Sequence, residues 1–339
     1  MTASKTIRRL PLRAASLMAL AAAALLAAML VPSVRAQQQA PPQGQQREQQ
    51  PEFIRQGQQL LREGKLDDAL ALYQNTLKSS PDSLPANLAA GSVLDLLGKG
   101  EEARKYFAKA IAVAGAPERK AMAERSMAMS YAFESNCTKA IEYEQKVFDY
   151  YVSTKDFYQQ GEMADEGARV CLDSGDLRNA DSAGHVALAG EWYQRGHDLG
   201  LKEPDIKPER VDLWNFRWEN AQARIAARRG QQAEAEKHVA AAKAIFDKGK
   251  IPEQAPFVPY LEGYVAFFLQ DYKTSLDDLL KANQRDAFIQ CLLGRTYEQL
   301  GEKEKAIESY KKAAATISHN PPAAYAVPFS RKRLAALEK

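Results

Sequence analysis

The chain has 339 residues, of which 45% are hydrophobic and 26% are charged. This length accommodates two ordinary domains or one elongated array of repeats. The formal net charge of +3 comes from the first 36 residues, which hold five Lys or Arg and no acid, so the rest of the chain carries −2. Bulk charge therefore gives no argument for nucleic-acid binding, and we expect no nucleic-acid partner.

Residues 1–36 have the layout of a secretory signal peptide. A basic start precedes an apolar run over 14–31, and Val34 and Ala36 place small residues before a cleavage site. An uncleaved membrane anchor is the alternative, because 18 apolar residues is a borderline length for a span. The run is mostly Ala, which favours cleavage. We expect a periplasmic or secreted protein with no stable membrane insertion after cleavage, and N-terminal membrane anchoring as the alternative.

Residues 37–50, with the sequence QQQAPPQGQQREQQ, follow the signal peptide. A Gln-rich segment with two Pro buries little apolar surface, so it is expected to be a disordered linker. From residue 51 to the end the pattern is helical, and alternating β patterns are absent.

Three stretches of the helical part share one spacing of small and aromatic residues. A Gly is followed five residues later by Ala and four residues after that by an aromatic: Gly64, Ala69 and Tyr73; Gly98, Ala103 and Phe107; Gly301, Ala306 and Tyr310. Another Gly lies seven positions before each of these glycines, at Gly57, Gly91 and Gly294. Residues three and four apart share one face of a helix. The spacing predicts paired helices that approach through small residues, with the aromatic filling the next layer.

This pattern resembles the tetratricopeptide repeat, a helix–turn–helix unit of 34 residues. Ala69 and Ala103 are 34 residues apart, and weaker copies are centred on Ala140, Ala180, Ala235 and Ser275. Seven units result, over about 50–318. The resemblance implies an all-α fold, a right-handed α-solenoid of repeats with a C-terminal capping helix.

An insertion interrupts the repeat over 191–211, which would divide the chain into subarrays at 51–190 and 212–339. We expect the helix before it to overrun into Tyr193 and a long helix to begin near Pro208, a favoured first-turn position. The insertion is interpreted as a kink between the subarrays, with a partner contact as the alternative.

The C-terminal stretch HNPPAAYAVPFSRKRLAALEK has prolines at its start and middle. It is expected to break at Pro321 and Pro322 and again at Pro328, leaving Phe329–Lys339 as the helix that covers the last apolar surface.

Three cysteines remain in the chain, Cys137, Cys171 and Cys291. An odd number in an exported protein permits at most one internal bridge. The first interpretation is three small buried hydrophobic residues. A Cys137–Cys171 bridge is the alternative, because the two lie in neighbouring units.

No arrangement of residues in the sequence indicates catalysis. The four His form neither HExxH nor a Cys-His cluster, and no nucleophile motif or phosphate-binding loop is present. We therefore predict no catalytic, metal-binding or cofactor-binding residues and no cofactor.

In repeats of this family the first helix of each unit faces a concave groove, and this predicts the binding residues. They are Arg217, Asn220, Arg224, Tyr260, Tyr264, Phe267 and Arg295. Tyr and Arg dominate binding hot spots, and Arg can grip a carboxylate with two parallel hydrogen bonds. The alternative is that the three aromatic residues pack against the insertion or the cap. A nucleic-acid groove would need a sustained basic stripe, which acids in the second and fourth units interrupt.

The sequence thus predicts an exported, non-catalytic scaffold that binds a protein or peptide in the groove, with cell-envelope assembly as one setting. The alternatives are a structural spacer within a larger complex and an enzyme with a site built across the groove. No sequence feature indicates an oligomeric state.

Overall fold

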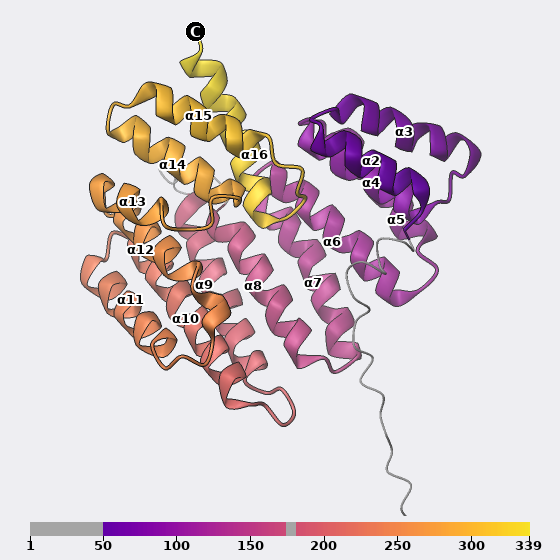
Figure 1. The fold of residues 1–339 in the computed structure, drawn as a ribbon. Coiled ribbons are helices and arrows are strands. Elements are labelled where there is room, and N and C mark those ends of the chain that lie inside the picture. The colour runs from indigo at the N-terminus through magenta and orange to yellow at the C-terminus, as the bar shows by residue number, and fades with distance from the viewer. Residues whose placement is uncertain (1–49, 174–180) are drawn as a thin grey trace, which may run out of the picture. The chain divides into compact units, whose positions relative to one another are not determined.

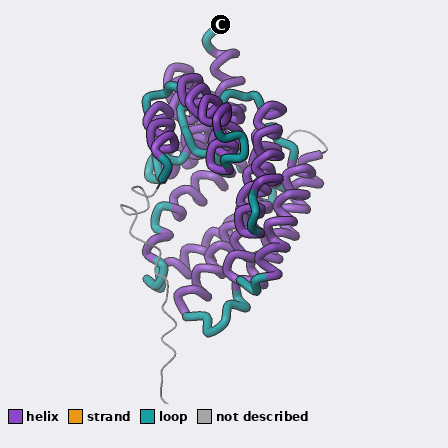
Figure 2. Tube along the Cα trace, turned by 90° about the vertical axis from the view of Figure 1, so that its right-hand side faces the viewer, coloured by secondary structure: helices purple, strands orange, loops and turns teal. Residues whose placement is uncertain are grey.

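Fifteen α-helices, a short 3-10 helix (Pro252–Gln254) and no strand make up the residues that the computed structural model describes, 50–173 and 181–339 (Figure 1, Figure 2). Seven helix pairs follow one another, and a single helix ends the chain. The pairs are α2 (Glu52–Arg62) and α3 (Leu66–Ser79), α4 (Leu84–Leu96) and α5 (Gly100–Val113), α6 (Pro117–Phe133) and α7 (Cys137–Ser153), α8 (Phe157–Asp173) and α9 (Asp181–Gly200), α10 (Pro208–Arg228) and α11 (Gln232–Phe246), α12 (Phe257–Phe268) and α13 (Tyr272–Leu279), and α14 (Ala287–Gln299) and α15 (Lys303–Ala314); the last helix is α16 (Pro321–Leu337). This is the predicted α-solenoid. The predicted signal peptide and the predicted linker up to residue 49 lie outside the described residues.

The small residues of the repeat pack as their spacing predicts. A Cβ added at Gly91 would lie 2.6 Å from the ring of Phe107, and one added at Gly294 would lie 2.6 Å from the ring of Tyr310. The second helix of a pair can therefore approach the first only where the first has no side chain. Gly98 has a φ of 77°, the left-handed conformation expected of the residue that ends the first helix.

The weaker copies of the repeat use the same packing. The side chains at the predicted repeat centres of the described residues are fully buried, each with 0% exposure: Ala69, Ala103, Ala140, Ala235, Ser275 and Ala306. Ala128, Ala168 and Ala223, which replace the first-helix Gly, are also 0% exposed. Ala180 falls in 174–180, outside the described residues.

The insertion is mostly helix. The helix before it, α9, continues past Tyr193 to Gly200, whereas α10 begins at Pro208 as predicted. The reason is packing, because the indole of Trp214 lies where a side chain at Gly200 would otherwise be. The same indole donates a hydrogen bond to Glu203 Oε1 over 2.6 Å. The kink and the partner contact at this insertion both stay predictions.

The C-terminal helix differs from the prediction. α16 is one helix from Pro321 to Leu337 with Pro328 inside it, so the expected break at Pro328 is wrong. A proline inside a helix costs about 3 kcal/mol through a lost hydrogen bond and a clash. Packing on both sides offsets this cost. Tyr325 contacts Phe288 with ring centroids 5.4 Å apart, and Val327 lies in a core cluster with residues of α4 and α6.

α16 therefore does more than cap the last pair. It packs against α14 and α15, and also against α6 and α8 from the first half of the chain (Figure 1). Arg331 donates a hydrogen bond to the carbonyl oxygen of Leu96. Just before the helix, His319 Nε2 lies 2.8 Å from Asp95 Oδ2, and the imidazole stacks on Phe133. Chain segments more than 200 positions apart thus share one core.

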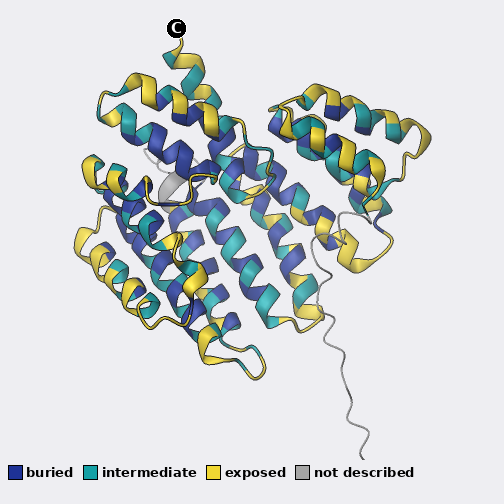
Figure 3. Cartoon of the chain, in the orientation of Figure 1, coloured by how far each residue is buried: buried dark blue, intermediate teal, exposed yellow. Residues whose placement is uncertain are grey.

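Most helices bury one side and expose the other, whereas α8 has no exposed residue (Figure 3). Where the structure describes the chain, no helix combines the length and the apolar character needed to cross a membrane.

Cys137 and Cys171 form a disulfide with their Cα atoms 5.0 Å apart. Cys137 is the first residue of α7, and Cys171 lies near the end of α8, so the bridge joins neighbouring units. The expectation of three unpaired cysteines is thus wrong for two of them. Cys291 is buried and free.

Candidate functional site

Four of the seven predicted binding residues meet in one cavity of about 520 Å³. Arg217, Asn220 and Arg224 reach it from α10, and Tyr260 reaches it from α12. The first helices of successive pairs form its walls, so it lies on the face where the groove was predicted. The segments before α12 and α14 and the start of α16 complete the lining.

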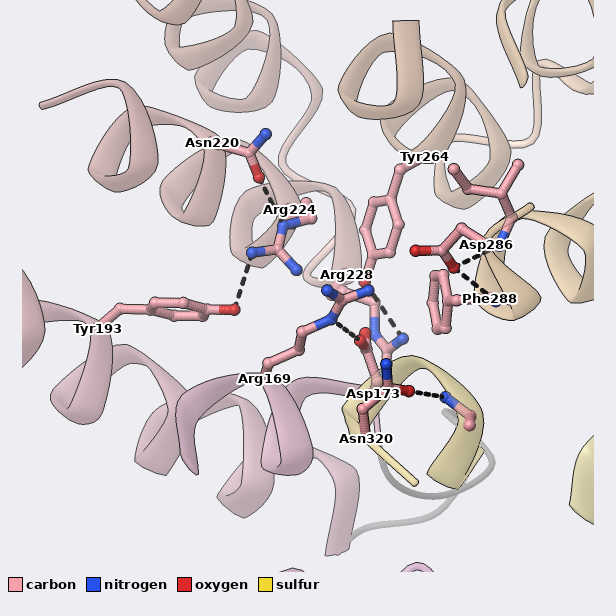
Figure 4. A network of polar contacts seen from close by, with 12 residues as sticks. Arg169, Asp173, Tyr193, Asn220, Arg224, Arg228, Tyr264, Asp286, Phe288 and Asn320 are labelled. Carbon is pink, nitrogen blue, oxygen red and sulfur yellow. Dashed lines mark hydrogen bonds and ion pairs between the residues drawn. The ribbon is translucent and has the colours of Figure 1, made fainter. Parts of the chain in front are cut away.

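Arg224 is 6% exposed and binds only neutral groups (Figure 4). Its Nε donates to Asn220 Oδ1 over 2.9 Å, and its Nη2 donates to the hydroxyl of Tyr193 over 2.8 Å. Asn220 and Arg224 are four residues apart on α10, which places both on the same face of the helix. Burial raises the pKa of Tyr193 to about 12 despite the opposing charge of Arg224, so that hydroxyl is neutral at pH 7.

Arg169 of α8 points into the same region (Figure 4). Its Nε lies 3.4 Å from Asp173 Oδ2, and its guanidinium lies 5.7 Å from the ring centroid of Phe288. The charge of Asp173 balances that of Arg169. Arg228, one turn beyond Arg224, donates to the hydroxyl of Tyr264 over 3.4 Å.

Tyr260 brings an unused hydroxyl to the cavity. The residue is 6% exposed, and its hydroxyl has no hydrogen-bond partner in the structure. Its ring is held edge-on against Tyr264 and Phe288, with centroids 5.9 and 6.3 Å away. Burial raises the pKa of Tyr260, so the group is a neutral donor at pH 7.

The other two arginines of the cavity are paired with acids. Arg217 binds Glu162 and lies 4.0 Å from Asp165 Oδ2, and Arg125 of α6 forms a two-point ion pair with Glu166. These pairs satisfy the charges of both arginines.

Asp165 titrates near neutral pH. Burial of the carboxyl raises its pKa to about 7; the charge of Arg217 opposes this shift and that of Glu162 adds to it. The side chain is 22% exposed and lines the cavity. The protonation state of the cavity therefore changes within the physiological pH range.

The three remaining predicted residues do not line the cavity. Tyr264 is 0% exposed and Phe267 is 6% exposed, in a core cluster on which Tyr325 of α16 packs. Arg295 donates to the hydroxyl of Tyr325 over 3.0 Å and lies 4.6 Å from the ring centroid of Phe267. The expectation that Tyr264 and Phe267 are exposed in a groove is wrong, because both side chains are buried among residues of α12, α13 and α14. One residue of the cap, Tyr325, packs on this cluster, and a binding role for these residues stays a prediction.

Arg125 and Tyr193 are among the lining residues that the sequence analysis did not predict. Arg125 lies three residues before Ala128, which is the offset that singled out Asn220 before Ala223, so the same rule applied to the third unit would have found it. Tyr193 belongs to a second helix, and no signal in the sequence places it at the first-helix face.

A second hollow of about 650 Å³ lies over α11, α12 and α13. Its floor is apolar, with Val239, Val265 and Leu269, and acids such as Asp271 and Asp278 line it as well. None of the predicted binding residues lines this hollow. Among the described residues, no group of three or more His, Cys, Asp or Glu is placed to hold a metal ion.

Known families match both ends of the solenoid. Residues 54–118 and residues 289–316 each match a family model described as a tetratricopeptide repeat. The chain therefore contains tetratricopeptide repeats at both ends of the solenoid. The matched segments contain the three strong copies of the Gly and Ala spacing. Repeats of this family generally mediate protein–protein interactions.

Several solved structures are similar to this chain. A tetratricopeptide repeat protein from Parabacteroides merdae has 14% identity and a TM-score of 0.46, over 85% of this chain and 98% of that one. The Cut9–Hcn1 hetero-tetramer of APC/C has 18% identity and a TM-score of 0.41, over 84% and 48%. The P58(IPK) TPR domain has 12% identity and a TM-score of 0.31, over 85% and 98%. Among curated proteins, none matches this sequence.

Proposed function

We propose that this protein is an exported, non-catalytic scaffold that binds a short segment of a partner protein in the cavity between α8, α10 and α12. The observation that carries the proposal is the convergence of Arg217, Asn220, Arg224 and Tyr260 on one hollow. Pockets that bind small ligands have volumes of about 300–1,000 Å³. The cavity, at about 520 Å³, accommodates a few residues of a peptide.

An exposed aromatic residue that lines the cavity supports the proposal of a protein partner. Phe257, at the start of α12, lines the cavity and is 46% exposed, which is unusual for a Phe in a soluble fold. An exposed aromatic ring beside buried Arg and Tyr gives the combination that dominates protein interfaces.

Export has independent support. The leader at 1–36 has the pattern of a signal peptide, and the Cys137–Cys171 bridge belongs to an oxidising compartment. We propose a periplasmic or secreted location, with cell-envelope assembly as the setting. The test is the mass of the protein recovered from the host: cleavage after Ala36 gives a chain that begins at Gln37, whereas an anchored protein keeps residues 1–36 and stays in the membrane fraction.

The binding test compares two exposed apolar side chains. Phe257→Asp should abolish capture of the partner by an affinity-tagged mature chain, because it places a charge at the mouth of the cavity. Leu280→Asp is the matched control, since Leu280 is 50% exposed and does not line the cavity. If Phe257→Asp retains every partner of the unchanged chain, binding in the cavity is wrong.

A structural spacer is the second candidate, and one observation favours it. Tyr264 and Phe267, the aromatic part of the predicted groove, are buried in a core cluster instead of being open to a partner. A spacer would keep its function in Phe257→Asp and lose it when a helix pair is deleted.

A further inference from the structure

The cavity holds a buried hydroxyl that the protein itself does not use. Tyr260 is 94% buried, and its oxygen has no partner, although a buried polar group without a hydrogen bond is costly. The hydroxyl belongs to a residue that lines the hollow. Such a group is satisfied when a ligand supplies an acceptor.

Arg224 supplies the charge. It is 94% buried, and both of its hydrogen-bond partners, Asn220 and Tyr193, are neutral. Burial of a cation without a counter-charge is unfavourable, and no carboxylate of the described residues lies within ion-pair distance of this guanidinium. Its Nη1 has no hydrogen-bond partner among the described residues.

Arg169 adds a second guanidinium at the same place. Its own acid, Asp173, lies near Nε, so its Nη groups have no acid partner in the described residues. Burial raises the pKa of Tyr260 while the charges of Arg224 and Arg169 lower it, which indicates that both guanidiniums lie near that hydroxyl. Figure 4 shows Arg169 and Arg224 pointing toward the same space.

We propose that the cavity binds a carboxylate group, which accepts hydrogen bonds from Arg224, Arg169 and the hydroxyl of Tyr260. The inference rests on the proposed function and names the chemical group that anchors the bound segment. The carboxylate belongs either to a polypeptide, at its C-terminus or on an Asp or Glu side chain, or to a small organic acid.

A single negative charge fits this site better than a phosphate dianion. Arg125, Arg169 and Arg217 already have acid partners, so Arg224 is the one lining arginine without one. Asp165 and Asp286 also line the cavity and would repel additional negative charge. A guanidinium and a carboxylate are matched in geometry and in charge.

Tyr260→Phe tests the site without disturbing the fold. The change removes a hydroxyl that makes no hydrogen bond within the protein, so the melting temperature should stay the same or rise. Binding of propionate, followed by ligand-observed NMR at low salt, should weaken about tenfold. Tyr264→Phe is the matched control, because Tyr264 is buried beside Tyr260 but does not line the cavity, and propionate should bind this variant as it binds the unchanged chain.

Propionamide has nearly the same size as propionate but no charge. Comparing the two ligands separates the contribution of charge to binding from that of shape. Propionamide should bind at least about tenfold more weakly than propionate. The proposal is overturned if propionamide binds equally well, if propionate does not bind, or if Tyr260→Phe and Tyr264→Phe bind propionate alike.

Three pools of random hexapeptides, compared with propionate on the immobilised mature chain, then identify the source of the carboxylate. Retention of a pool with a free C-terminus and no Asp or Glu indicates a chain end, and retention of an amidated pool that contains Asp and Glu indicates a side chain. Binding of propionate without retention of either of these two pools indicates a small organic acid. Equal retention of an amidated pool without acids overturns the proposal.

The two proposals fail in different ways. If Phe257→Asp loses the partner and Tyr260→Phe binds it with full affinity, the proposed function stands and the carboxylate site is wrong. If both variants keep the partner, the cavity is not where the partner binds, and the propionate experiment alone decides on the carboxylate.

Discussion

The first pair of helices and the sixth have the same repeat and different surfaces. Gly57 of α2 and Gly263 of α12 are equivalent, and an added Cβ would clash with the second helix in both. Ile54, three positions before Gly57, is half-buried, whereas Tyr260, three positions before Gly263, is buried. The position of a residue in the repeat therefore determines which way its side chain points. The neighbouring helices determine how exposed that side chain is.

α16 is a neighbour that the first pair of helices lacks. It contacts α14, α15, α6 and α8, and Tyr325 packs on the aromatic cluster of α12. The contacts of α2 are with α3 and α4. The first pair therefore has its own local packing, while the sixth shares a core with the end of the chain.

Of the changes that test this comparison, removal of α16 should have the largest effect on stability. Deletion of residues 321–339 exposes buried side chains that pack on α16, such as Phe288 of α14, and we expect a loss of about 5–10 kcal/mol in the free energy of unfolding. Hydrogen exchange should show lost protection in α12 and α14 and unchanged protection in α2 and α3. Uniform loss along the chain would contradict the distinction between the two regions.

Removal of the disulfide should have the second-largest effect on stability. The bridge closes a loop of 34 residues, for which loop entropy gives about 4 kcal/mol of stabilisation. Cys137→Ala with Cys171→Ala should lower the free energy of unfolding by this amount in urea titrations. Reductant should destabilise the unchanged chain to the same extent and leave the double variant unaffected, and an equal effect on both would show that the loss does not come from this bridge.

The pH dependence of stability should report Asp165. Its pKa is raised to about 7 in the folded protein and is near 4 when unfolded. The contribution of this raised pKa is fully present below about pH 4 and is lost as pH rises toward 7. Relative to Asp165→Asn, the unchanged chain should lose about 2–4 kcal/mol over this range, at about 1.4 kcal/mol per pKa unit with partial screening by cavity water. Parallel pH profiles of the two chains would refute the assignment.

Overpacking substitutions should have the smallest effect on stability, and this effect should be the same in both regions. Ala103→Leu and Ala306→Leu each place a bulky side chain where the helices of a pair meet, at positions with 0% exposure. Each should cost about 1–3 kcal/mol through overpacking, measured by thermal unfolding. Exposed Ala108 and Ala112 offer control sites for the same change. A large cost at one packing site alone would show that the two pairs do not share one packing mode.

The sequence by itself determined the repeat. The spacing of Gly91, Gly98, Ala103 and Phe107 predicted two helices, the turn between them and the side chains that meet, and Pro208 predicted the start of α10. These features depend on contacts between residues that are near in sequence, where helical periodicity maps position directly onto a face.

Only the tertiary structure decided the path of α16, the pairing of the cysteines and the lining of the cavity. The contact of Arg331 with Leu96 joins residues 235 positions apart, and Tyr193 reaches Arg224 from a helix outside the predicted face. No periodic pattern encodes such contacts. They follow from how successive pairs rotate against one another, and that rotation depends on all the side chains packed between them.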